Sequence, residues 1–167
     1  MQRLWERLSR EGLLKPDAEP LAEPRAAGRA ELELELRWLC DRGVLEGGLS
    51  IALDVRPDEA FGAVCVAIGG NARGIRVVDV RYRPVPELRL RLGENEERWE
   101  VEDLHALVHN LNQLLADDPA ARAVAILGEW EDALQLWCVP KAKLRALLRA
   151  DYFAPHNRRQ LESLADR

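Results

Sequence analysis

Threonine is absent from the chain, and serine occurs only at Ser9, Ser50 and Ser163. None of these serines lies in the GxSxG turn that presents the nucleophile of many hydrolases, and the chain has only three histidines that could serve as bases. Paired carboxylates could support acid–base catalysis, but no pattern selects one pair among the many. We therefore favour a protein without catalytic activity.

Cysteine is also sparse. Cys40, Cys65 and Cys138 form no CxxC pair and are odd in number, so the sequence predicts neither a disulfide framework nor a zinc site. Cys65 and Cys138 lie inside apolar runs, where a free cysteine behaves as a small hydrophobic residue. Cys40 is the most plausible exposed thiol. We expect the protein to bind no cofactor.

Lysine occurs only at Lys15, Lys141 and Lys143, so arginine supplies most of the positive charge. A charged fraction of 32% with few Asn and Gln residues is typical of thermophilic proteins, although the arginine bias can equally reflect the base composition of a genome. The net charge of −5 provides no overall attraction to nucleic acid or to an anionic membrane.

Long apolar runs are missing as well. No stretch reaches the roughly 18 apolar residues that a membrane span requires, and the charged N-terminus lacks the hydrophobic region of a signal peptide. We expect a soluble, cytoplasmic protein that does not contact a membrane. A length of 167 residues with 47% hydrophobic residues is typical of one domain with an ordinary core.

The N-terminal region divides from the rest of the chain at a proline-rich segment. Residues 1–15 are predicted to form a short amphipathic helix, and residues 16–28 a linker or surface loop, because proline favours extended backbone. Residues 29–167 are predicted to form a single α+β domain. The first helix either folds back onto this domain or docks as an arm on another subunit.

The region from residue 31 to residue 101 is predicted to be mostly extended. Residues 31–38 alternate with a period of two, which predicts a strand with its leucines on one face. Leu and Glu also favour helices, so propensity conflicts with periodicity here, and we follow the periodicity. Residues 60–68 favour a strand too, with a helix that carries Pro57 in its first turn as the alternative. Further strands are predicted at 49–55, 75–82, 87–92 and 98–101.

Helices dominate the remainder. Residues 102–116 carry leucines at helical spacing, and a hairpin is predicted from 123–127 and 133–139. Two more helices are predicted at 140–148 and 156–165. Short turns between consecutive strands predict an α+β fold with one antiparallel sheet of about five to seven strands and helices packed mainly on one face.

One spacing resembles that of a metal site. Glu102, His105 and His109 recur at intervals of three and four, which places them on one helical face. The pattern is not HExxH, and no further ligand is evident. A solvated polar face is therefore the preferred interpretation, and these residues are only weak candidates for metal ligands.

Positive charge is concentrated between residues 73 and 91. In this segment Arg81 and Arg83 share one strand face, as do Arg89 and Arg91. An outward-facing ribbon of arginines would suit RNA, DNA or an acidic partner. The simpler interpretation is that the arginines pair with acidic faces of neighbouring strands, which contributes about 0.2–1 kcal/mol per pair and requires no function.

Tryptophan is the one abundant aromatic residue. Trp137 is predicted to lie in the core, whereas Trp130, at a hairpin turn between two glutamates, is predicted to be partly exposed. Tryptophan and arginine are enriched at interface hot spots, so Trp130 joins the four arginines as a candidate partner-binding residue. The leading hypothesis is a small non-catalytic protein-interaction or oligomerisation domain. The alternatives are a nucleic-acid-binding protein that uses the arginine ribbon and a metal-dependent hydrolase built around His105 and His109.

Overall fold

A computed structural model describes residues 2–19, 32–69, 74–82, 84–118, 120–149 and 155–166. The helices are α1 (Gln2–Arg10), α2 (Leu32–Asp41), α3 (Pro57–Ala67), α4 (Leu104–Leu114), α5 (Lys141–Leu148) and α6 (Pro155–Ala165). The strands are β1 (Gly48–Ala52), β2 (Ile75–Arg81), β3 (Glu87–Leu92), β4 (Asn95–Glu100), β5 (Arg122–Trp130) and β6 (Ala133–Pro140). The α+β class is therefore confirmed. None of the helices in these ranges is long and apolar enough to cross a bilayer.

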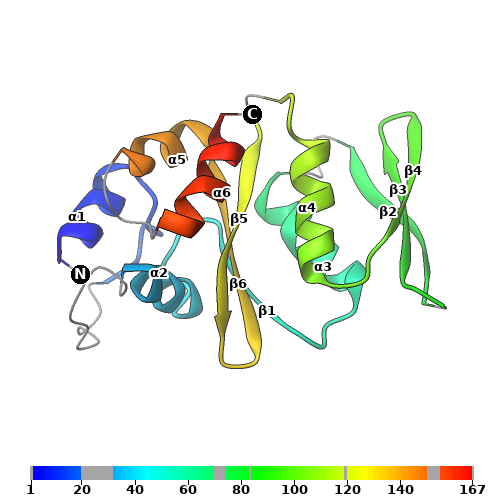
Figure 1. Ribbon diagram of the computed structural model, residues 1–167, viewed down its shortest axis with the longest axis horizontal. Coiled ribbons are helices and arrows are strands. Elements are labelled where there is room, and N and C mark those ends of the chain that lie inside the picture. The colour runs from blue at the N-terminus through cyan, green and yellow to red at the C-terminus, as the bar shows by residue number, and fades with distance from the viewer. Residues whose placement is uncertain are drawn as a thin grey trace.

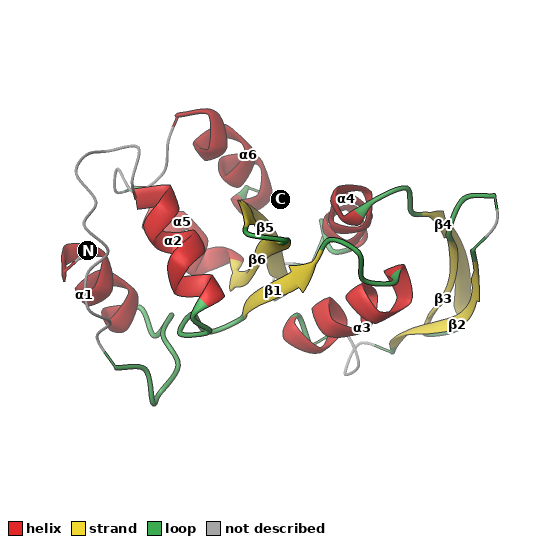
Figure 2. Cartoon of the chain, turned by 90° about the horizontal axis from the view of Figure 1, so that it is seen from below, coloured by secondary structure: helices red, strands yellow, loops and turns green. Residues whose placement is uncertain are grey.

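The strands form two sheets, where the sequence predicted one. Both sheets are antiparallel and three-stranded, with the orders β1-β6-β5 and β2-β3-β4. Figures 1 and 2 show the two sheets on either side of α3 and α4, which fill the space between them. Each helix connects the two sheets along the chain: α3 lies between β1 and β2, and α4 lies between β4 and β5.

Helices also cover both faces of the β1-β6-β5 sheet, where one face was predicted. One core lies between the two sheets and includes Phe61 of α3 and Trp99 of β4, whose rings meet edge to face with centroids 6.0 Å apart. The other core lies beneath α1, α2, α5 and α6 and includes Trp137 of β6, which is fully buried as predicted. Strands β5 and β6 are apolar at nearly every position, which is typical of strands buried on both faces.

The predicted strand at residues 31–38 is wrong, because this segment belongs to helix α2. Leu36, Leu39 and Cys40 are buried at the i, i+3, i+4 spacing of a helix and pack into the second core. The helix propensity of Leu and Glu is thus reinforced by burial of one helical face, and the period-two alternation carries no structural weight.

The predicted strand at residues 60–68 is also wrong, and the alternative helix is correct. Pro57 occupies the first turn of α3, where its missing N–H is not needed, and acidic side chains follow it. Phe61, Val64 and Cys65 are buried on the inner face of α3. The continuous apolar run is that of a helix packed between two sheets.

The other predicted elements are confirmed with small shifts in their ends. The segment predicted at 98–101 is strand β4, which begins earlier, at Asn95. The first helix ends at Arg10, and its Leu4 and Leu8 are buried in the second core of the same chain. Most of the predicted linker 16–28 lies outside the described residues.

Helix α4 is capped at both ends. Asp103 accepts a hydrogen bond from the Ala106 N–H at 2.7 Å, as an N-cap residue does. At the other end the buried Lys141 ammonium donates to three carbonyl oxygens, those of Leu115 (3.0 Å), Ala116 (2.9 Å) and Asp118 (3.2 Å). Burial lowers the pKa of Lys141. These caps fix the position of α4 against β5.

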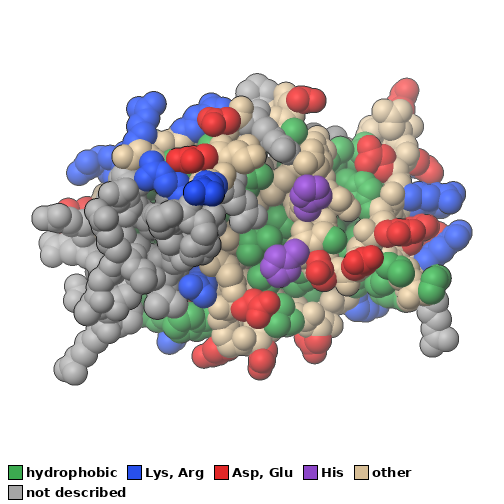
Figure 3. Space-filling view, in the orientation of Figure 1, with side chains coloured by type: hydrophobic (Ala, Val, Ile, Leu, Met, Phe, Trp, Pro, Cys, Tyr) green, Lys and Arg blue, Asp and Glu red, His purple; other side chains and the backbone are tan. Residues whose placement is uncertain are grey.

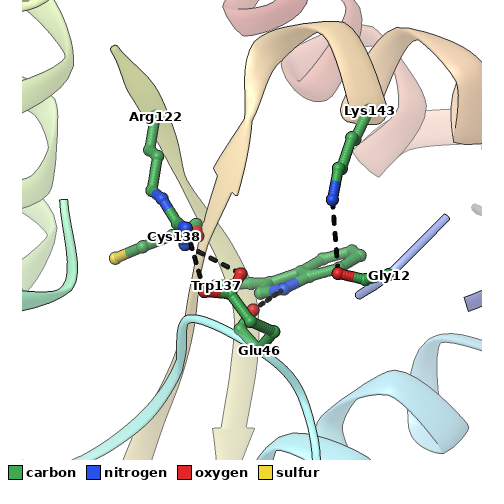
Figure 4. A network of polar contacts seen from close by, with 6 residues as sticks. All are labelled: Gly12, Glu46, Arg122, Trp137, Cys138 and Lys143. Atoms are coloured by element: carbon green, nitrogen blue, oxygen red, sulfur yellow. Dashed lines mark hydrogen bonds and ion pairs between the residues drawn. The ribbon is translucent and has the colours of Figure 1, made fainter. Parts of the chain in front are cut away.

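A polar network joins the loop before β1 to β5 and β6 (Figure 4). Arg122 donates two hydrogen bonds of 2.9 Å to the Glu46 carboxylate and a third, of 3.0 Å, to the Cys138 carbonyl oxygen. The Trp137 indole N–H donates to the Glu46 carbonyl at 3.0 Å. Gly47 has φ +75° and lies so close to the Cys138 carbonyl that a Cβ atom would overlap it.

Candidate functional site

The two histidines of the weak metal candidates lie together, but Glu102 does not join them. His105 and His109 are exposed on the outer face of α4 and line one groove, whereas Glu102 precedes the helix and is not part of the groove lining. Within the described ranges, no three His, Cys, Asp or Glu side chains are grouped closely enough to hold a metal ion. The feature that the two histidines share is therefore the groove that they line.

The groove lies between α4 and α6 and has a volume of about 430 Å³. Figure 1 shows β5 between these two helices, and Figure 3 shows the histidine side chains exposed on the same face. Val108, Ile126 and Leu164 provide apolar surface inside the groove, and polar side chains form its rim. The rim residues are His105, His109, Asn112, Gln113 and Ser163. Its volume falls in the range of ligand sites, about 300–1,000 Å³.

The floor of the groove is the free edge of a β-sheet. Strand β5 is the last strand of the β1-β6-β5 sheet, so one side of its backbone has no neighbouring strand. Asn112 pairs with that side at Val124: its amide accepts from the Val124 N–H at 2.9 Å and donates to the Val124 carbonyl at 2.8 Å. Because backbone groups alternate in direction along an antiparallel strand, the N–H and C=O of Ile126 face the groove as well.

The other sheet edges are protected by features of their own strands, whereas β5 is shielded by its neighbours. Strand β4 exposes charged side chains along its length, β2 contains a bulge between Val77 and Asp79, and β1 is only five residues long. Charges, bulges and short length are the usual devices that prevent an edge from pairing with another chain. Residues 123–128 of β5 contain no charged side chain. The β5 edge is shielded only by Asn112 and by the two helices beside it.

No family model, characterised protein or solved structure matches this chain. The geometry of its own residues is therefore the basis for assigning a function.

The predicted arginine ribbon is partly assembled. Arg89 and Arg91 lie on the outer face of β3, opposite the buried Leu88 and Leu90. Arg81 lies on the same face of β2, with its Nε 3.7 Å from the Asp79 carboxylate. The fourth predicted member, Arg83, lies outside the described residues.

Two arginines that were not predicted as partner-binding residues lie on the same face of the sheet. Arg76 of β2 is directly opposite Arg91, and Arg98 of β4 is directly opposite Arg89. Arg98 was not predicted as part of this surface because it was the first residue of the strand predicted at 98–101. Its facing depends on the register with β3, which the sequence does not give. Arg91 is paired with Glu96 at 2.8 Å, so the expectation of pairing with acidic neighbours holds for this arginine.

Trp130 is placed far from the arginines in the fold. It lies at the end of β5, beside the β5–β6 turn, and is half-buried, in accord with its predicted partial exposure. Its strand belongs to the β1-β6-β5 sheet, whereas the arginines belong to the other sheet. Trp130 therefore does not extend the arginine surface.

The thiols are buried and protonated. Cys40, Cys65 and Cys138 are free and buried, so the expectation that Cys40 is exposed is wrong. Desolvation raises the pKa of each of these thiols to about 12. Because the thiolate is the reactive form, none of the three is poised to act as a nucleophile.

Proposed function

We propose that this protein is a non-catalytic interaction domain that binds an extended segment of another protein along the open edge of β5. The observation that carries the proposal is the strand-free edge of β5 at Ile126, which lies in a groove between α4 and α6. A strand added to a sheet edge is held by main-chain hydrogen bonds, and it gains specificity from pockets that receive alternate side chains.

The groove supplies both kinds of contact. The backbone of Ile126 offers one donor and one acceptor to an added strand, which would lie about 4.8 Å from β5. Ile126 and Leu164, both partly exposed, offer apolar contacts, and His109 and Ser163 offer hydrogen bonds at the rim. A bound segment would therefore present apolar and polar side chains in alternation.

An extended segment fits this site better than a second folded copy of the protein. The β5 edge is recessed between α4 and α6, and side chains of both helices line the groove around it. A single strand can enter such a recess, whereas the β5 edge of a second copy would bring its own flanking helices against these walls.

The experiment is a binding screen with a synthetic library of short peptides of random sequence. Two variants test the site: Ser163→Trp fills the groove from α6, and Ile126→Pro removes the edge N–H without removing a hydrogen bond to β6. Ala142→Trp, at an exposed position of α5, is the matched control for an added tryptophan. We expect both site variants to weaken peptide binding at least about tenfold, or 1.4 kcal/mol, and the control to bind like the wild type.

Hydrogen exchange provides a second measurement. Binding should protect the Ile126 N–H, which is expected to exchange rapidly in the free protein. Peptides that bind equally well to the wild type and to both site variants would refute the proposal. A wild-type dimer in light scattering that Ser163→Trp converts to a monomer would also refute it, because the groove would then be occupied by a second copy.

A further inference from the structure

A second surface, at the end of the molecule's long axis that the β2-β3-β4 sheet occupies, carries a separate inference (Figure 1). The outer face of the β2-β3-β4 sheet is turned away from α3 and α4, and no described segment covers it (Figure 2). Four arginines form a continuous band across this face, from one edge strand to the other. In order across the sheet, the arginine band consists of Arg76, Arg91, Arg89 and Arg98.

The band contains two like-charged pairs in direct cross-strand register. Arg76 faces Arg91 between β2 and β3, and Arg89 faces Arg98 between β3 and β4. Like charges directly opposite one another on neighbouring strands are destabilising. The fold therefore maintains an arrangement that its own stability does not favour.

Three of the four band arginines form no close ion pair with a described residue. Arg91 has an ion pair with Glu96, but across the described ranges no carboxylate lies within ion-pair distance of Arg76, Arg89 or Arg98. The Nε atom of Arg89 is buried and has no hydrogen-bond partner. The hydrogen bond from Arg91 lowers the pKa of Glu96, and the charges of Arg89 and Arg98 act in the same direction. The band therefore concentrates four positive charges, in a chain whose net charge is −5, on a face that also carries the carboxylates of neighbouring residues.

We infer that the arginine band is a docking site for an acidic segment of a partner protein, recognised through its carboxylates. The planar guanidinium group presents a fork of donors that matches a carboxylate bidentately. A segment with several Asp or Glu side chains would neutralise both like-charged pairs and satisfy the Nε of Arg89.

Two features of the same face favour an acidic protein segment over nucleic acid. Carboxylates interrupt the face beside the band, namely those of Asp79, Glu87, Glu96 and Glu100, so the face offers a short group of arginines and not the extended basic track that a phosphate backbone follows. Among its described residues the face also lacks aromatic side chains on which bases could stack, since Trp99 points inward and is 8% exposed. A short acidic segment can place its charges on the arginines alone.

The test uses a fluorescent oligo-glutamate peptide as the probe, with double-stranded DNA as a parallel probe, at low and at physiological salt. The band variant is the double substitution Arg89→Gln and Arg98→Gln. The matched control is Arg145→Gln with Arg149→Gln, which removes the same charge from exposed positions at the end of α5. We expect the peptide to bind the wild type and the control alike, and to bind the band variant at least about tenfold more weakly.

Two further measurements are the urea stability of the band variant and the binding of DNA to the wild type and the band variant. The urea stability of the band variant should stay close to that of the wild type, because the substitutions relieve the Arg89–Arg98 repulsion and also remove two charges that favour ionised Glu96. An equal loss of peptide binding in the control would overturn the inference, since the interaction would then depend only on net charge. Tighter binding of DNA than of the peptide, lost in the band variant, would also overturn it in favour of a nucleic-acid site.

This inference is independent of the groove at β5. The Ser163→Trp variant, which fills the groove, should bind the oligo-glutamate peptide as the wild type does. Loss of the random-peptide interaction therefore leaves the arginine band untouched, and failure of the arginine band leaves the groove untouched.

Discussion

Alkaline pH should destabilise this protein through its three buried thiols. Each has a pKa of about 12 in the folded protein, against an ordinary value of 9.0. As the pH rises, the unfolded chain therefore loses its thiol protons before the folded protein does. The stability that depends on these thiols is complete below about pH 9 and is lost progressively above it.

The expected loss is large. A difference of one pKa unit corresponds to about 1.4 kcal/mol, so at about pH 10 each thiol lowers the free energy of unfolding by about 1.4 kcal/mol relative to neutral pH. Three thiols together lower it by about 4 kcal/mol. A domain typically has a total stability of about 5–15 kcal/mol, so the effect is a substantial fraction of the whole.

The assay is urea unfolding followed by tryptophan fluorescence at about pH 8 and about pH 10, for the wild type and for a variant with Cys40, Cys65 and Cys138 all changed to Ala. Tyrosine and lysine titrate in both proteins, so their contribution cancels in the comparison. The wild type should lose about 4 kcal/mol more than the variant between the two pH values. If the triple variant does not fold, Cys65→Ala alone should remove about a third of the effect. Parallel losses in the wild type and the variant would refute the burial of the thiols.

Three further predictions concern a close backbone approach at β6 and the side chains that hold α4 in place. In urea unfolding, Gly47→Ala should lower the free energy of unfolding by about 3 kcal/mol or more, because the new Cβ atom would overlap a β6 carbonyl. Gly93→Ala, also at positive φ but in open space, should lower it by about 1 kcal/mol. Similar losses in the two variants would contradict the close approach. Lys141→Met should lower the free energy of unfolding by about 2–4 kcal/mol because it leaves three carbonyl groups in the turn after α4 without their donor, while Lys143→Met, which removes one exposed hydrogen bond, should change the melting temperature little. Asn112→Ala should lower the free energy of unfolding by about 2–3 kcal/mol and should speed hydrogen exchange at the Val124 N–H, to which Asn112 is bonded. Unchanged exchange at this N–H would show that another group shields the edge.

Much of the secondary structure is encoded locally, and there the sequence was sufficient. The helix α4 was recognised from its leucine spacing, and the β5–β6 hairpin from two apolar runs around a polar turn. The α+β class followed from the same patterns. In each case the signal is carried by neighbouring residues whose side-chain periodicity matches one backbone geometry.

Tertiary packing decided the segments whose local signals were mixed. In α2 the alternation favoured a strand, but burial of Leu36, Leu39 and Cys40 against the β1-β6-β5 sheet favours a helix. In α3 an apolar run without clear periodicity is a helix because it is packed between two sheets. Neither environment is visible from the segment alone, because both depend on residues distant in the chain.

The candidate sites were also predictable in part from the sequence and in part only from the tertiary structure. The sequence by itself determined that arginine is concentrated near β3 and that nucleophiles and metal motifs are scarce. Only the tertiary structure decided that Arg98 completes the arginine band, that Cys40 is buried, and that the edge of β5 lies open between α4 and α6. Strand register, burial and edge exposure depend on which elements become neighbours in space, and that choice is made by the packing of the whole chain.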